Sequence, residues 1–244
     1  MSQNVCVVIV TYNRLETLKT ALDHILAQTL TPAAILIVDN NSTDGTRQFL
    51  ETLKDQPPMQ CLCLPTNTGS AGAIAHAMKV GLTVGTYDYF WILDDDTFYE
   101  KKALRELVDH ISRSSFDLLG LHGALIRFGK KHPLDPQQKL QPADYALIDG
   151  ALIKTAAIQK AGVVDEKFFM MCDDHEYCMR LKNMDARSAY YKVVPITAST
   201  SAAREGLPGL PCGEGTIHPG TTCSSSNNIF PSPICWVMHG CREN

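Results

Sequence analysis

Short apolar runs alternate with segments of helical periodicity in the first part of the chain. The apolar runs predict strands covered on both faces, at residues 5–10, 35–38, 60–64 and 87–93. Apolar residues at helical spacing predict helices between these strands. The alternation therefore predicts an α/β fold with a Rossmann-like, mostly parallel central sheet and helices on both faces. The first helix is expected after Asn13, which can cap it, with Leu15, Leu18, Leu22, Ile25 and Leu26 facing inward. The second is expected from about residue 43, with Phe49, Leu50 and Leu53 facing inward, and residues 67–72 open a third that ends at about residue 84.

Beyond residue 101 the pattern is mixed. It predicts a helix with Leu104, Leu107, Val108 and Ile111, then a strand at 118–128 and a polar loop at 130–142. A strand at 145–153, interrupted by Asp149 and Gly150, and a short helix at 155–161 follow. The last elements are a helix containing Tyr177, Met179, Arg180 and Leu181 and a strand at 189–194. Residues 205–244 hold six Gly, five Pro, four Ser and four Cys without periodicity, a composition typical of loop or disorder. We therefore expect one domain at 1–204 and an irregular tail at 205–244.

Composition and charge exclude some partners. The 244 residues carry a net charge of −4 with no basic tract, so we expect no nucleic-acid partner. The chain shows no signal-peptide pattern and no apolar run approaching about 18 residues, so we expect a cytoplasmic protein. Peripheral contact with the inner face of the membrane stays open. Five of the nine cysteines are expected as buried reduced thiols (Cys6, Cys61, Cys63, Cys172 and Cys178). Zinc is not expected, because Cys61 and Cys63 form a CxC and not a CxxC, and no second pair at zinc spacing follows.

Polar clusters follow the predicted strands. They lie at residues 11–14, 39–41, 67–72 and 94–96. The carboxyl ends of parallel strands meet at one edge of a sheet, and ligands bind beyond that edge. Together the clusters predict one ligand-binding rim.

Three consecutive carboxylates, Asp94, Asp95 and Asp96, end the fourth predicted strand. Like charges side by side repel one another, and a divalent cation relieves that repulsion. Hard cations take carboxylate oxygens and complete their shell with water and substrate phosphates. The triplet therefore favours a metal–diphosphate site, and an acidic turn exposed to solvent is the alternative.

A nucleoside diphosphate fits the rest of the rim. Asp39 could accept a hydrogen bond from a base N–H or a ribose hydroxyl, or only cap the following turn. Backbone groups near Thr11 and Tyr12 could line the base. Small residues at 69–72 could let the backbone approach a ligand and open a helix whose free N–H groups attract anions, or only permit close packing. Asn67 could equally be a plain turn residue.

A second acidic cluster contains Asp173, Asp174 and Glu176. One carboxylate at a helix N-terminus is explained by capping, but three suggest further chemistry. A carboxylate that faces the metal site could take a proton from an incoming hydroxyl, and one such base suffices for displacement with inversion at a sugar carbon.

The motifs together resemble a known family. They are Val-Thr-Tyr-Asn-Arg at 10–14, Val-Asp-Asn-Asn-Ser-Thr-Asp-Gly-Thr at 38–46, Asn-Thr-Gly-Ser-Ala-Gly at 67–72, Trp-Ile-Leu-Asp-Asp-Asp at 91–96 and Cys-Asp-Asp-His-Glu-Tyr-Cys-Met-Arg-Leu at 172–181. In this order they resemble glycosyltransferase family 2, and most of all its galactofuranosyl- and rhamnosyltransferase branch. The resemblance implies a GT-A fold, and metal-dependent, inverting transfer from a UDP- or dTDP-sugar donor to a glycan or lipid-linked acceptor.

The resemblance also implies roles for individual residues. Nucleoside contacts would come from Thr11, Tyr12, Arg14 and Asp39, and contacts to the ribose and diphosphate from Asn67. Mn²⁺ or Mg²⁺ would be held by Asp94 and Asp96, with Asp95 near the donor sugar or ribose. The catalytic base would be Asp174, with Asp173 and Glu176 around the acceptor, and Asp149 and Gly150 would match the family's sugar-side strand and loop.

One feature departs from the family pattern. Members usually carry a histidine after the base that often completes the metal site, but residues 193–203 contain none, and the next histidine is His218. Acceptor-binding helices are also not visible in the tail. A truncation or frame disruption near 198–205 would explain both, and sequencing the encoding DNA tests it.

Two other classes remain as alternatives. A catalytically impaired domain that binds nucleotide sugars would keep the rim but not turn over the donor. A nucleotidyltransferase would show a Gly-rich signature with Arg or Lys after the first strand, which residues 8–14 lack.

Overall fold

The computed structural model describes residues 3–127, 129–135, 137–192 and 195–197. All of these residues lie in one compact unit, which ends before Gly206. Expectations for the tail, for its four cysteines and for His218 therefore lie outside the described residues.

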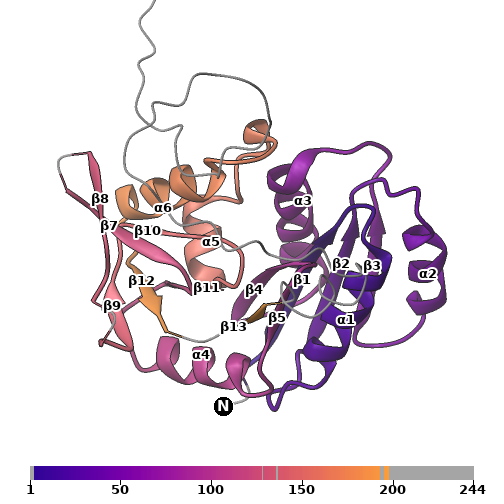
Figure 1. Cartoon of the computed structure of the whole chain (residues 1–244), viewed down its shortest axis with the longest axis horizontal. Coiled ribbons are helices and arrows are strands. Elements are labelled where there is room, and N and C mark those ends of the chain that lie inside the picture. Colours follow the sequence, from indigo (N-terminus) through magenta and orange to yellow (C-terminus); the bar gives the residue numbers. More distant parts are fainter. Residues whose placement is uncertain (1–2, 128, 136, 193–194, 198–244) are drawn as a thin grey trace, which may run out of the picture. The chain divides into compact units, whose positions relative to one another are not determined.

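A parallel sheet forms the first half of this unit (Figure 1). The strands β1 (Val5–Thr11), β2 (Ala34–Asp39), β3 (Met59–Cys63) and β4 (Tyr89–Asp94) run parallel in the order β3-β2-β1-β4. Strands β1, β2 and β4 are apolar almost throughout and buried, because helices cover both faces of the sheet. The predicted Rossmann-like, mostly parallel sheet is confirmed.

The same sheet continues with shorter strands. They are β11 (Leu152–Lys154), β6 (Leu118–Gly120), β12 (Ser188–Tyr191) and β9 (Leu140–Pro142), in that spatial order after β4. Strand β11 runs antiparallel to β4 and β6, whereas β12 runs parallel to β6. A three-stranded sheet of β10 (Tyr145–Ala146), β7 (Gly123–Arg127) and β8 (Lys130–His132) and a pair of β5 (Thr97–Tyr99) with β13 (Pro195–Thr197) complete the strands.

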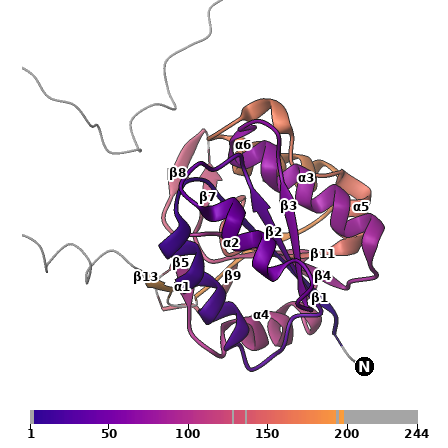
Figure 2. The same ribbon diagram turned by 90° about the vertical axis from the view of Figure 1, so that its right-hand side faces the viewer.

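Two hydrophobic clusters lie on opposite faces of the large sheet. One face carries α3 (Gly69–Val84), α5 (Thr155–Ala161) and α6 (Asp173–Asn183), packed on alternate strand residues such as Val8 and Leu36. The other face carries α1 (Leu15–Leu26), α2 (Thr46–Leu53) and α4 (Ala103–Ser112), packed on residues such as Ile9 and Ile37. Figure 2 shows the helices from the side of β3. Each strand thus sends neighbouring side chains to opposite cores, as the two-residue period requires.

Several predicted boundaries in the second half were wrong. The strand predicted at 118–128 breaks after Gly120, because β6 joins the large sheet while β7 pairs with β10 and β8. The interrupted strand at 145–153 is likewise two strands in two sheets. The predicted loop at 130–142 contains β8, whose residues are all polar and exposed, and β9, whose three residues are too few to show an alternating pattern. Strand β5 was not predicted, and β12 ends before residues 193–194, which lie outside the described part.

The first helix is not capped as predicted. Asn13 has a positive φ of 53°, and its Oδ1 accepts a hydrogen bond from the Thr43 N–H. The N–H of Leu15, at the start of α1, instead donates to Oδ2 of Asp44 at 3.0 Å. The cap therefore comes from another loop. Leu26, expected inward, is 51% exposed at the end of α1.

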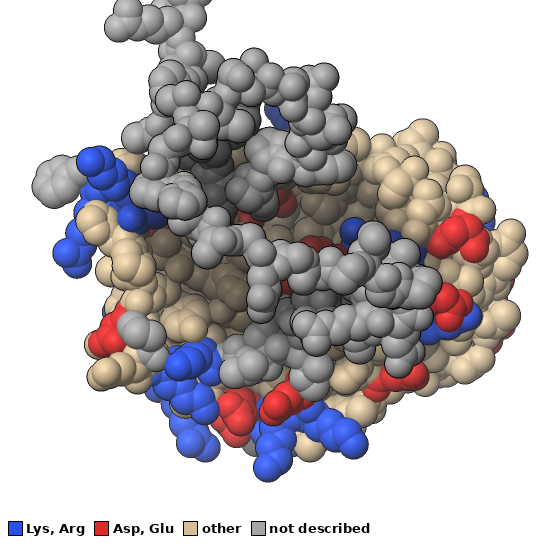
Figure 3. All heavy atoms as spheres, viewed as in Figure 1, with Lys and Arg blue, Asp and Glu red and all other residues tan. Residues whose placement is uncertain are grey.

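The cysteine prediction holds only in part. Cys6 and Cys178 are buried free thiols, but Cys61 is half-buried and Cys63 and Cys172 are exposed. Burial raises the pKa of the Cys6 thiol to about 12 and that of Cys178 to about 11. Within the described ranges, no helix is long and apolar enough to cross a membrane. Figure 3 shows acidic and basic side chains mixed along the lower edge of the face it presents.

Candidate active site

The predicted rim exists at the carboxyl ends of the four parallel strands. Thr11 at the end of β1 is paired in register with Asp39 at the end of β2, and its neighbour Val10 with Asp94 at the end of β4. Asp39 is paired in turn with Cys63 at the end of β3, just before the turn that opens α3. Equal register in parallel strands is what brings these distant segments together.

A cavity of about 260 Å³, which we call the donor cavity, opens at this rim. It contains all but one of the residues predicted for the nucleotide and the metal. Its lining is Val10, Thr11, Tyr12, Arg14, Asn40, Asn67, Gly69, Ser70, Asp94, Asp95, Asp96 and Met170.

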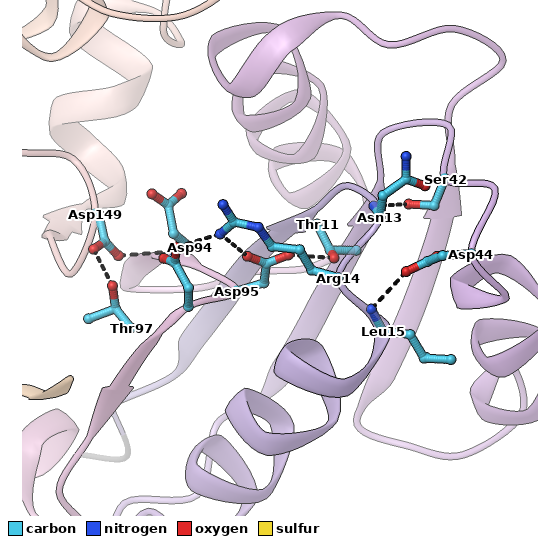
Figure 4. A network of polar contacts seen from close by, with 11 residues as sticks. Thr11, Asn13, Arg14, Leu15, Ser42, Asp44, Asp94, Asp95, Thr97 and Asp149 are labelled. Carbon is cyan, nitrogen blue, oxygen red and sulfur yellow. Dashed lines mark hydrogen bonds and ion pairs between the residues drawn. The ribbon is translucent and has the colours of Figure 1, made fainter. Parts of the chain in front are cut away.

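A hydrogen-bonded network holds the acidic triplet against β1 (Figure 4). The buried Thr11 hydroxyl donates to Oδ2 of Asp95 at 2.6 Å. The Arg14 guanidinium donates to Oδ1 of Asp95 at 3.2 Å and also to Asp96. Burial raises the pKa of Asp95, and the Thr11 bond and the Arg14 charge oppose that shift. Thr11 and Arg14 therefore fix Asp95, while Asp96 stays exposed.

Asp94 lies between other carboxylates. Its backbone N–H donates to Oδ1 of Asp149 at 3.0 Å, and the Thr97 hydroxyl donates to Oδ2 of Asp149 at 2.8 Å (Figure 4). Burial, and then the charges of Asp149, Asp96 and Asp95, raise the pKa of Asp94 to about 8. The strand end thus concentrates negative charge that Arg14 neutralises only in part.

A second cavity of about 250 Å³, which we call the base cavity, adjoins the first. Both cavities are lined by Ser70 and Asp94. The predicted base Asp174 lies in the base cavity. The full lining is Ser70, Ile74, Asp94, Leu147, Ile148, Asp149, Met171, Asp173 and Asp174.

Two of the four aspartates of the base cavity, Asp173 and Asp174, start α6. Asp173 is buried and Asp174 half-buried in the first helical turn, where the helix dipole favours negative charge. Burial, and then the neighbouring Asp174, raise the pKa of Asp173 to about 6. Oδ2 of Asp174 accepts a hydrogen bond from the Tyr145 hydroxyl at 3.1 Å.

Glu176 has a different environment. Its carboxylate forms a two-pronged ion pair with Arg180, at 2.7 and 2.6 Å, and Arg180 also donates to the carbonyls of Ala161 and Val163. Glu176 does not line the base cavity. In the described structure Glu176 holds Arg180, and Arg180 joins α6 to the end of α5.

The turn before α3 is held by Asn40. Its Nδ2 donates to Oδ1 of Asn67 and to the carbonyl of Gly69, each at 3.0 Å, and its Oδ1 accepts from the Thr68 N–H at 2.8 Å. The Gly69 N–H donates to Asn67 Oδ1, and the Ala71 N–H to the Phe169 carbonyl. Two of the N–H groups expected to be free for an anion are therefore already bonded within the chain.

The glycines of this turn serve packing. Gly69 has a φ of +73°, and a Cβ there would lie 2.0 Å from the Phe169 carbonyl oxygen. A Cβ at Gly72 would lie 2.7 Å from the Thr68 side chain. Both close approaches are to the protein itself, and neither glycine position is explained by a ligand.

Asp39 is fully buried and does not line the donor cavity. Its Oδ1 accepts from the Ser42 N–H at 2.8 Å, which is the turn-capping contact considered from the sequence. Its Oδ2 has no hydrogen bond and lies 3.5 Å from Nε of Arg47. A nucleoside contact by Asp39 stays a prediction.

Sequence comparison identifies the family. The model described as "Glycosyl transferase family 2" matches residues 6–145, more than half of the chain. The chain belongs to glycosyl transferase family 2. The match spans the rim and the donor cavity, except for Met170, and ends before α6.

Named relatives agree with this assignment. Galactofuranosyltransferase GlfT1 of Mycobacterium tuberculosis is 29% identical, and the match covers 98% of this chain and 76% of the relative. The GlfT1 of Mycolicibacterium smegmatis is also 29% identical, over 72% of this chain and 65% of the relative. Poly-beta-1,6-N-acetyl-D-glucosamine synthase of Staphylococcus aureus is 25% identical over 63% of this chain and 35% of its own length. The expected likeness to galactofuranosyltransferases is confirmed.

Solved structures share the fold of this family 2 chain. TarS of S. aureus in complex with UDP matches with a TM-score of 0.62 at 19% identity, over 78% of this chain and 58% of TarS. The mannosyltransferase PcManGT from Pyrobaculum calidifontis, in complex with GDP-Man and Mn²⁺, matches with a TM-score of 0.59 at 17% identity. The match covers 77% of this chain and 54% of PcManGT. The chain thus spans less than two thirds of these proteins, and the matches support the GT-A fold.

Several site residues of this family 2 chain were not singled out from the sequence. Asn40 and Ser70 lie inside quoted motifs, but nothing in their spacing separates them from their neighbours. Met170 and Met171 line the two cavities and are 61% and 58% exposed, in a loop where Phe169, Met171 and Cys172 all have positive φ. Tyr145 looked like an ordinary strand residue.

Proposed function

We propose that this family 2 chain transfers a sugar from a nucleoside diphosphate donor, a UDP- or dTDP-sugar, to a hydroxyl group of a glycan or lipid-linked acceptor. The carrying observation is that the donor and base cavities meet at Ser70 and Asp94. A donor with its nucleotide in one cavity would direct its sugar toward the cavity that contains Asp174. TarS in complex with UDP and PcManGT in complex with GDP-Man share the fold of this chain, which supports a donor of the nucleoside diphosphate class.

The donor cavity supplies the nucleotide contacts in this proposal. Tyr12 is 46% exposed at the cavity and offers a ring to the base. Arg14 offers a guanidinium to the diphosphate or nucleoside, and Asn67 an amide to the ribose or diphosphate. Asp95, fixed by Thr11, lies toward the ribose or donor sugar. Asp39 is buried behind the cavity lining, so its contact with the nucleoside would be indirect, through the residues that line the cavity.

A divalent cation, Mn²⁺ or Mg²⁺, fits the acidic strand end. The residues that would hold it are Asp94 and Asp96, because carboxylate oxygens suit a hard cation. Burial is the main cause of the raised pKa of Asp94, and the charges of Asp149, Asp96 and Asp95 add to it; a cation would relieve that repulsion. No group of three or more metal-binding side chains is gathered among the described residues, so its shell would include water and donor phosphate oxygens. When bound, the metal would neutralise the departing diphosphate.

Asp174 is the proposed catalytic base. It would take the proton of the acceptor hydroxyl as that oxygen bonds to the anomeric carbon of the donor sugar. The bond from that carbon to the diphosphate breaks, and the nucleoside diphosphate leaves with the electron pair. One displacement inverts the anomeric configuration. Asp173 lies beside Asp174 on the acceptor side.

Transfer and binding assays test this function. Wild-type protein is screened against UDP- and dTDP-sugars with Mn²⁺ for donor hydrolysis and transfer. Asp174→Asn should keep UDP affinity and lose roughly 10²-fold or more in kcat. Asp23→Asn on the exposed face of α1 should leave both unchanged. Full transfer by Asp174→Asn would reject the assigned base.

A binding domain without turnover is the second candidate. The observation that favours it is that the family match ends at residue 145, before Asp174, and that residues 193–203 lack the family histidine. Isothermal titration with UDP and dTDP, with and without Mn²⁺, detects binding by either candidate. Turnover of a donor that binds occurs only if the chain is an active transferase.

A further inference from the structure

The Tyr145 hydroxyl is the one group outside α6 whose hydrogen bond to the Asp174 side chain is seen in the described residues. It donates to Oδ2 at 3.1 Å from β10, a strand 29 residues away in sequence. Both side chains are half-buried. The contact therefore depends on how β10 is held against α6.

Two contacts hold Tyr145 in place. The next residue, Ala146, bonds through both its N–H and its carbonyl to Sγ of Cys178 on α6, each at 3.4 Å. On the other side, Lys131 of β8 places Nζ 4.4 Å from the centroid of the Tyr145 ring. The small sheet of β10, β7 and β8 thus fixes the ring relative to the first turn of α6.

The phenol is suited to donate a hydrogen bond. Burial, and then the charge of Asp174, raise the pKa of Tyr145 well above its usual range, so the hydroxyl keeps its proton in the working pH range. A donor on one carboxylate oxygen restricts rotation of the carboxyl group and stabilises its ionised form. Oδ2 of Asp174 then carries the Tyr145 bond, and no hydrogen bond to Oδ1 from outside α6 is seen among the described residues.

We propose that Tyr145 is the positioning residue of the base: its hydroxyl, bonded to Oδ2, orients the Asp174 carboxylate toward the acceptor hydroxyl. This inference rests on the proposed function of Asp174. Tyr145 itself is not assigned a contact with donor or acceptor. The three-stranded sheet then has a catalytic purpose, because it carries the residue that aims the base.

Other ionisable groups surround the pair and bear on any pH profile. The His175 ring lies 5.8 Å from the Tyr145 ring, centroid to centroid. The other ionisable groups that act on Tyr145 or contact its ring are Asp173 and Cys178 of α6 and Lys131 of β8. Asp94 and Asp149 line the same cavity as Asp174. A His175→Gln variant is therefore measured in parallel, to separate its titration from that of Asp174.

The test compares Tyr145→Phe with Tyr190→Phe. Tyr190 is half-buried in β12, and its hydroxyl has no hydrogen bond within the described part of the chain, so its removal costs no such contact. For Tyr145→Phe we expect unchanged UDP affinity, a fall in kcat of roughly 10-fold or more, and an acidic limb of the kcat profile displaced to higher pH. Tyr190→Phe and His175→Gln should keep that limb in place.

The outcomes separate this inference from the proposed function. If Asp174→Asn is inactive but Tyr145→Phe keeps wild-type kcat and pH profile, only the role of Tyr145 is overturned. A raised acceptor KM with unchanged kcat also overturns it, in favour of acceptor binding. NMR of the Asp174 carboxyl carbon, with the signal assigned by its loss in Asp174→Asn, tests the same point without turnover. The midpoint of the Asp174 titration should move to higher pH in Tyr145→Phe, and an unmoved midpoint rejects the inference.

Discussion

Removing the Arg14 guanidinium should make the acidic strand end bind Mn²⁺ more tightly in the absence of nucleotide. Arg14 forms ion pairs with Asp95 and Asp96, so a metal on Asp96 must compete with it. The Arg14 side chain is 51% exposed and that of Asp96 is 48% exposed, so their pair belongs to the weak surface class of about 0.2–1 kcal/mol. The Asp95 side chain is 5% exposed, and its pair with Arg14 does not enter the competition, because Asp95 is not assigned to the metal.

The upper end of that range, about 1 kcal/mol for the Asp96 pair, corresponds to roughly 5-fold tighter binding of Mn²⁺ by Arg14→Gln. Loss of a nearby positive charge acts in the same direction. Arg14→Lys keeps the charge but not the planar fork and should lie in between. UDP affinity in the presence of Mn²⁺ should fall in Arg14→Gln, because Arg14 lines the donor cavity.

Isothermal titration with MnCl₂ alone, and then with UDP at saturating Mn²⁺, measures both effects. Arg113→Gln is the matched control, since it removes the same charge from an exposed residue at the end of α4. Asp94→Asn should weaken metal binding. Unchanged or weaker Mn²⁺ binding in Arg14→Gln would refute the competition between Arg14 and the metal.

Three further predictions concern stability. Gly69→Ala should lower the free energy of unfolding by at least about 2 kcal/mol, whereas Gly45→Ala, also at a positive φ (+98°) but with no atom closer than 3.6 Å, should cost about 1 kcal/mol; urea unfolding compares them. Asp173 has a folded pKa of about 6, above the ordinary 3.8, so its contribution is favourable below pH 4 and is lost as pH rises to about 6. Asp173→Asn should therefore remove part of the decline in Tm between pH 4 and pH 7. Asn40→Ala leaves the turn before α3 without three bonds and should cost roughly 2–4 kcal/mol, together with weaker UDP binding in titration.

Local sequence determines the parallel half of the sheet and its rim. Residues 5–10 and 35–38 are apolar without interruption because helices cover both faces, and such runs are recognisable without knowledge of the partner strands. Polar residues directly after each run, such as Thr11 and Asp94, then fall on one edge by topology alone. The prediction of the donor cavity depended on nothing more distant than this.

The rest of the site depends on contacts between distant segments. Residues 118–128 are mostly apolar, but the chain passes from one sheet to another after Gly120, and hydrophobicity does not record which sheet a strand joins. The cap of α1 comes from Asp44, because the loop before α2 reaches it. The pairing of Tyr145 with Asp174 likewise requires β10 and α6 to be placed first.

The negative charge of the donor cavity should couple the binding of the metal to the binding of the donor. The donor side of the site presents Asp94, Asp95 and Asp96, with Asp149 behind them, and the pairs seen among the described residues give this cluster only Arg14 as a cation. A nucleoside diphosphate brings more negative charge to the same place, so its binding there is opposed unless a second cation arrives with it. Metal and donor should therefore bind synergistically, each raising the affinity for the other by the same factor. Arg14, freed from Asp96 by the metal, is then available to the diphosphate. If UDP binds equally well with and without Mn²⁺, the acidic strand end does not face the diphosphate, and the assignment of Asp94 and Asp96 fails with it.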